Sequence, residues 1–166
     1  MDKETDNLDD IWDKHLEFEF DKKDASAAMT TMTEDPYVHS IPTLIGGRGY
    51  NGVYDFYKNH FIGKTPKDLK IAKVSRTVGK VVDEFILSFT HDIEFEYLLP
   101  GVPPTGKYVE IPHIAVVKFK NNKISHEHLY WDQASVLVQI GLLNPEKIPI
   151  TGIEQTKKLV ELSKKN

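Results

Sequence analysis

The chain has 166 residues and a mass of 19.0 kDa; 40% of its residues are hydrophobic, 28% are charged and none is cysteine. This length predicts one domain, and the lack of cysteine excludes disulfides, thiolate nucleophiles and cysteine-based zinc sites. A formal net charge of −4 and a pI near 6.0 argue against a nucleic-acid partner, because neutralising phosphates needs a basic surface.

The first residues are acidic and polar, without the cationic and apolar segments of a secretory signal. Apolar stretches such as Phe85–Phe89 are much shorter than the ~20 residues that span a bilayer. We therefore expect a cytoplasmic protein that has no membrane segment.

The first sixty residues have the pattern of helices. Apolar residues spaced by three and four predict an amphipathic helix over 7–21. Asp24 can cap a second helix over 25–32. A proline-bounded extended segment over 35–42 follows, then a glycine-rich loop, and a third helix is predicted over 52–61.

From residue 71 the apolar residues alternate with polar ones, which is typical of strands with one buried face. Two hairpins are predicted, 71–78 with 81–95 and 108–120 with 123–132, around Gly79-Lys80 and Asn121-Asn122. Helical segments follow at 134–143 and after Thr151. Helical segments that come before and after a meandering sheet in the sequence predict the α+β class.

In the first hairpin, a two-residue turn at Gly79-Lys80 places Arg76 opposite Asp83, which predicts a cross-strand ion pair. The second strand of this hairpin carries an apolar face that includes His91 between Phe89 and Ile93. His91 is therefore a candidate for a site on that face, although a single histidine in such a pattern is more often a hydrogen-bonded core residue.

In the second hairpin, a two-residue Asn121-Asn122 turn pairs residue i with residue 243 − i. This register gathers polar side chains on one otherwise apolar face, and they are His113, His128, Tyr130 and Asp132. A partly desolvated carboxylate beside imidazoles is typical of general acid/base catalysts. The register predicts Asp132, His128 and His113 as catalytic residues and Tyr130 as a pocket residue. An exposed sheet face would have the same sequence, and a slip of one residue would dissolve the cluster.

The opposite face of the same hairpin is also apolar; its residues include Ile114, Val116, Leu129 and Trp131. A sheet with two apolar faces needs a second cover, and we expect a homodimer through this face. Packing under the C-terminal helix of the same chain is the alternative.

Nucleotide-binding, phosphate-binding and serine-hydrolase motifs are missing from the sequence. His126 and His128 share a strand face and could chelate a metal together with His113. Any two strand residues spaced by two share a face, however, so the pattern is weak. We expect neither a metal nor a cofactor.

Several segments together resemble the SnoaL-like branch, named for a polyketide cyclase, of the nuclear transport factor 2-like superfamily. They include Asp35–His39, Phe56-Tyr57 with His60-Phe61, Arg76–Gly79, Val82–Glu84, Thr90–Asp92, Leu99–Lys107 and Glu127–Ser135. The resemblance covers residues 8–143 approximately, which leaves 144–166 as a helical tail of a single SnoaL-like domain over 1–166.

The resemblance implies a cone, in which a curved antiparallel sheet wraps around the N-terminal helices as in the cystatin-like α+β barrels. It also implies an apolar pocket at the mouth of the cone and a homodimer through the back of the sheet. His39 and Tyr37 beside the mouth, and Trp12 and His15 on the first helix, become further pocket candidates.

Two functions follow from the resemblance and the polar cluster. The first is a cofactor-independent acid/base enzyme, of isomerase, cyclase or hydrolase type, that acts on a mostly apolar, carbonyl-bearing substrate. The second is a non-catalytic module of the same fold that binds a ligand or a protein.

Overall fold

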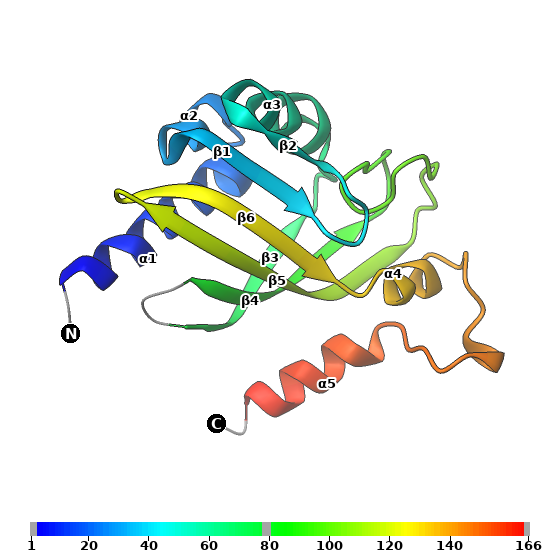
Figure 1. Cartoon of the computed structure of the whole chain (residues 1–166). Helices are drawn as coiled ribbons and strands as arrows, with labels where there is room; N and C mark the ends of the chain where they lie inside the picture. The colour runs from blue at the N-terminus through cyan, green and yellow to red at the C-terminus, as the bar shows by residue number, and fades with distance from the viewer. Residues whose placement is uncertain (1–2, 78–80, 165–166) are drawn as a thin grey trace.

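A curved, unclosed six-stranded sheet forms the frame of the molecule, with strand order β2-β1-β6-β5-β4-β3 (Figure 1). The computed structural model describes residues 3–77 and 81–164, with side chains from residue 8 onward. The strands are β1 (Met32–Ser40), β2 (Gly46–Arg48), β3 (Lys70–Arg76), β4 (Val82–Thr90), β5 (Tyr108–Lys120) and β6 (Lys123–Trp131). All pairs are antiparallel except β1 with β6, which run parallel.

The helices fall into two groups (Figure 1). The N-terminal group is α1 (Lys3–Leu16), α2 (Ala25–Thr30) and α3 (Gly49–Asp55), and it packs against β1 and β6. α4 (Gln133–Gln139) and α5 (Glu154–Ser163) follow the sheet and contact β5. This arrangement confirms the predicted α+β class.

The predicted first helix is two elements, since α1 continues directly into a π-helical turn, η1 (Glu17–Asp21). A second π-helical turn, η2 (Phe56–Phe61), extends α3. Such turns are frequent at functional sites. Asp24 caps α2 as predicted, with its carboxylate accepting the Ala27 N–H.

The first hairpin has the predicted pairing close to its turn. Arg76 lies opposite Asp83, and its guanidinium is 2.9 Å from the Asp83 carboxylate. The predicted turn at Gly79-Lys80 lies outside the described residues. β4 ends at Thr90 rather than at residue 95, so the predicted strand was too long.

The second hairpin departs from the predicted register. Asn121 and Asn122 both have positive φ, 52° and 55°, as the predicted turn requires. Ser125 is then an extra residue on β6, a β-bulge, and beyond it residue i pairs with 244 − i, as in His113 with Trp131. A shift of one residue exchanges the two faces of a strand, so the side chains of β6 after Ser125 point to the faces opposite to those predicted.

The core lies between the N-terminal helices and the inner face of the sheet and is mostly aromatic and aliphatic. Leu129 and Trp131 belong to this core, so the prediction that they share the outer face with Ile114 and Val116 was wrong. On the outer face, Ile114 and Val116 are 38% and 36% exposed. None of the helices among the described residues has the length and apolar character of a membrane span.

Candidate functional site

The predicted polar cluster on the second hairpin does not form. His113 is buried on the inner face, whereas His128 and Tyr130 point to the outer face and Tyr130 is 39% exposed. The bulge at Ser125 causes this separation, because it turns β6 relative to β5.

Asp132 has a local structural contact instead of a place in the cluster. It is exposed, and it caps α4 by accepting the backbone N–H groups of Ala134 and Ser135. Its second oxygen accepts a hydrogen bond from Gln155 at 2.6 Å. The expectation that Asp132, His128 and His113 act together was therefore wrong in its geometry.

His128 belongs to an aromatic group on the outer face that also contains two of the expected pocket residues, Tyr37 and His39. The Tyr37 hydroxyl lies 3.1 Å from His128 Nε2, and the Tyr37 ring stacks on His126 at 4.5 Å. His39 pairs with His128 across β1 and β6. The outer position of these rings separates them from the core.

His91 lies just beyond β4, where it is buried. Its Nδ1 lies 3.2 Å from the Thr105 hydroxyl, in the turn that leads to β5. This contact is that of a hydrogen-bonded core histidine, the alternative weighed for it above.

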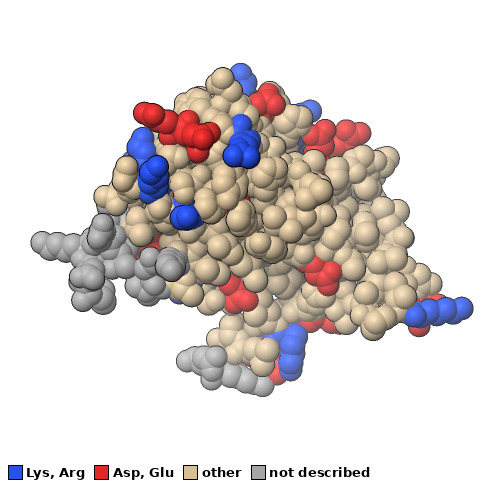
Figure 2. Space-filling view, viewed as in Figure 1, with Lys and Arg blue, Asp and Glu red and all other residues tan. Residues whose placement is uncertain are grey.

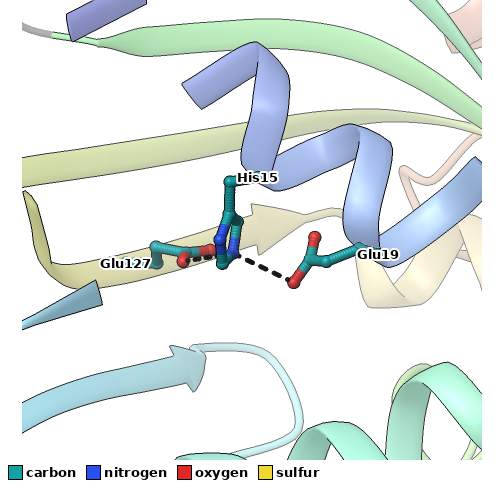
Figure 3. A group of neighbouring side chains, drawn as sticks. All are labelled: His15, Glu19 and Glu127. Carbon is teal, nitrogen blue, oxygen red and sulfur yellow. Dashed lines mark ion pairs between the residues drawn. The ribbon is translucent and has the colours of Figure 1, made fainter. Parts of the chain in front are cut away.

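A second polar cluster lies inside the molecule, and the register prediction missed it (Figure 3). His15 Nε2 is 3.3 Å from a Glu19 carboxylate oxygen and 3.2 Å from a Glu127 carboxylate oxygen. The Tyr57 hydroxyl lies 3.1 Å from the same nitrogen and donates to Glu127 at 3.2 Å. His15, Glu19 and Glu127 are only 0%, 6% and 2% exposed. We call these four residues the buried carboxyl cluster.

The buried carboxyl cluster is built from four elements, α1, η1, η2 and β6. His15 and Glu19 are four residues apart where α1 passes into η1, so they share one helix face. Tyr57 comes from η2, and Glu127 reaches the inner face only because of the bulge in β6. The spacing of His15 and Glu19 was visible in the sequence, but the position of Glu127 depended on the bulge.

The hydrogen bonds around His15 define where its protons lie. The Thr31 hydroxyl donates to the Ala28 carbonyl at 2.7 Å, so it can only accept from His15 Nδ1, which is 2.6 Å away. His15 Nδ1 therefore carries a proton. His15 Nε2 faces two carboxylates, and a second proton on this nitrogen removes the repulsion between them.

The charges of the buried carboxyl cluster are coupled. Burial by itself lowers the pKa of His15, but the carboxylates of Glu19 and Glu127 raise it, and the result is a pKa of about 10. Burial also raises the pKa of Glu19 above that of an exposed glutamate. His15 is thus charged at neutral pH, while Glu19 holds its proton to higher pH than usual.

The buried carboxyl cluster borders a small, mostly apolar cavity between the N-terminal helices and the sheet. Its lining includes Trp12, an expected pocket residue, and the polar groups Glu19, Tyr57, Tyr97, His113 and Glu127. The free space amounts to about 20 Å³ for the centre of a water molecule, enough for about one ordered water. A larger ligand requires the lining side chains to move.

Two groups of side chains offer histidine ligands for a metal ion. The weak chelating pattern of His126, His128 and His113 is divided between the two faces of the sheet. The ligand atoms of His15, Glu19 and Glu127 lie within 4.8 Å of one another and could surround an ion. The proton that His15 holds at neutral pH balances part of the same carboxylate charge, so a proton and a metal ion are alternatives at this cluster.

No protein-family model matches the chain, and no curated protein matches its sequence. Solved structures do match. A proposed SnoaL-like polyketide cyclase from Jannaschia sp. CCS1 aligns with a TM-score of 0.71 and 16% identity, over 87% of this chain and 98% of that one. The proposed hydroxylase AclR from Streptomyces galilaeus aligns with a TM-score of 0.64 and 16% identity, over 98% of this chain and 99% of that one.

A proposed ketosteroid isomerase from Kribbella flavida DSM 17836 aligns with a TM-score of 0.56 and 10% identity, over 78% of this chain and 80% of that one. Identities this low relate the folds and not the activities. Together with the curved sheet and the N-terminal helices, these matches show that the chain has the fold of the SnoaL-like and nuclear transport factor 2-like proteins.

Proposed function

We propose that the chain binds a small, mostly apolar, carbonyl-bearing molecule in the cavity and transfers protons to and from it without a cofactor. Glu19 carries the proton in this proposal. The observation that supports it is the position of Glu19, which borders the apolar cavity and is held by His15 of the buried carboxyl cluster.

The chemistry follows from the surroundings of Glu19. Burial raises the pKa of its carboxyl group, so the ionised form is a stronger base than an exposed glutamate. One carboxylate oxygen pairs with His15 and the other points away from it (Figure 3). In the proposed reaction Glu19 removes a proton next to the ligand carbonyl and returns it at another position. This is isomerase-like or cyclase-like chemistry.

A non-catalytic binding module is the second candidate. It is favoured by the small free space in the cavity and by the number of hydrogen bonds that the buried carboxyl cluster already makes. In this case the cluster would stabilise the core or orient a ligand.

Exchange of hydrogen for deuterium at the carbon next to a carbonyl tests the proposal without a known substrate. A panel of small ketones in D₂O, such as acetophenone and 1-indanone, is followed by NMR with and without the protein. The wild-type protein is expected to accelerate exchange, and Glu19→Gln should reduce the acceleration by about 10²-fold or more.

Glu17→Gln is the matched control, because Glu17 lies on the same helical segment but is exposed and pairs with Lys22. It should retain the full rate, as should wild-type protein dialysed against EDTA. Ketones that bind to the protein without any accelerated exchange would support the binding module and reject the enzyme.

A further inference from the structure

Tyr97 and His113 form a second polar pair at the same cavity. The Tyr97 hydroxyl lies 2.7 Å from His113 Nε2, and both side chains are buried. The imidazole stacks on the rings of Phe85 and Trp131, with centroids 4.9 Å away in each case. These contacts hold the imidazole in one orientation.

The second ring nitrogen of His113 has no partner. Among the residues that the structure describes, Nδ1 is buried without any hydrogen bond. Burial lowers the pKa of His113 to about 3, so the ring is neutral and carries one proton. An N–H without an acceptor costs more than an unfilled lone pair, which favours the proton on Nε2.

This tautomer leaves the Tyr97 hydroxyl proton outside the pair. With its proton on Nε2, His113 donates to the Tyr97 oxygen, and the Ser40 hydroxyl beside it can donate to the same oxygen, so neither contact needs the Tyr97 hydroxyl proton. Burial raises the pKa of Tyr97 well above its ordinary value, and the hydroxyl keeps this proton. Both residues line the cavity that Glu19 borders.

We propose that the Tyr97 hydroxyl, positioned by His113, donates a hydrogen bond to the carbonyl oxygen of the ligand in this cavity. The inference rests on the proposed function and adds the group that binds the ligand oxygen. It also selects the ligand class, because Glu19 and Glu127 line the same cavity and disfavour an anion. The expected ligand is an uncharged ketone or aldehyde.

Two isosteric probes test this hydrogen bond. Acetophenone has a carbonyl oxygen where α-methylstyrene has a CH₂ group, and the affinity of each is measured by NMR titration. In Tyr97→Phe, the affinity for acetophenone relative to that for α-methylstyrene should fall by about fivefold to tenfold. This change corresponds to the loss of one ordinary hydrogen bond. His113→Gln should retain the wild-type ratio, since its amide can donate to Tyr97.

Tyr108→Phe is the matched control, because Tyr108 is 51% exposed, donates to Glu110 and is not among the residues that line the cavity. It should leave the ratio unchanged. An unchanged ratio in Tyr97→Phe would overturn the inference while binding, and thus the proposed pocket, stands. If neither probe binds, the proposed pocket falls and the inference with it. Independently of any probe, ¹⁵N NMR of the imidazole that shows the His113 proton on Nδ1 would also overturn it.

Discussion

Glu127 lies 3.2 Å from His15 Nε2, although strict alternation along the second hairpin puts Glu127 on the other face of the sheet. A single extra residue, Ser125, accounts for the difference, because it moves every later side chain of β6 to the opposite face. The same shift removes His128 and Tyr130 from the interior. One bulge thus decides which titratable groups meet the cavity.

The buried carboxyl cluster should make the free energy of unfolding decrease as the pH becomes alkaline. The folded-state pKa of His15, about 10, lies above the unfolded value near 6.5. Its stabilising effect is therefore complete below about pH 6.5 and is lost as the pH rises toward 10. Urea unfolding across this range should show falling stability for the wild type and a flatter dependence for His15→Gln. His60→Gln is the control, because His60 also pairs with carboxylates but is only partly buried, and it should behave as the wild type. The same pH dependence in His15→Gln and the wild type would contradict a charged, buried His15.

His113 should make the free energy of unfolding decrease as the pH becomes acidic. Its folded-state pKa of about 3 lies below the unfolded value. Stability is complete above about pH 6.5 and falls as the pH drops toward 3, because protons bind the unfolded chain more tightly. Replacing His113 with Phe should remove part of this acid loss in urea unfolding curves. An identical acid loss in the wild type and the variant would show that His113 is not buried in its neutral form.

Asp83 makes a buried ion pair that should be costly to break. It is 1% exposed, and it accepts hydrogen bonds from Trp12 Nε1 at 2.7 Å and from Arg76 at 2.9 Å. Arg76→Met leaves this carboxylate without its cation and should lower the free energy of unfolding by about 3 kcal/mol. Lys73→Met is the control, since Lys73 pairs with Asp13 at an exposed position and should cost less than about 1 kcal/mol. Equal losses in the two variants would contradict the buried pair.

The outer face of the sheet remains the expected homodimer surface. Charged side chains gather around the rim of this face and are few in its middle (Figure 2), and Ile114, Val116 and Tyr130 are partly exposed there. Light scattering should give the mass of a dimer for the wild type and of a monomer for Ile114→Asp. Leu44→Asp, at an exposed loop residue, should leave the dimer intact. A wild-type monomer would reject this surface.

The sequence was sufficient for most elements of the fold, although β2 was expected to be a loop and β4 was predicted too long, and it was insufficient for the site. Periodicity and capping placed the helices, and the Asn121-Asn122 turn and the Arg76–Asp83 pair were found where they were predicted. These features depend on local propensity, which short segments of sequence carry. The buried carboxyl cluster depends on a bulge and on two π-helical turns, η1 and η2. Neither the bulge nor the π-helical turns have a reliable local signal. A single residue inserted in a strand, for example, moves all later side chains to the opposite face of the sheet, yet the alternation on either side of it looks the same in the sequence.

The most direct test of the account compares two pH profiles of the same protein. The exchange rate of a ketone probe in D₂O is measured against pH, and the ¹³C signal of the Glu19 carboxyl carbon is titrated in parallel. If Glu19 carries the proton, the two curves rise together, with an apparent pKa above that of an exposed glutamate. A Glu19 carboxyl that titrates as an exposed one, or an exchange rate that does not follow it, would contradict the role of Glu19 as proton carrier.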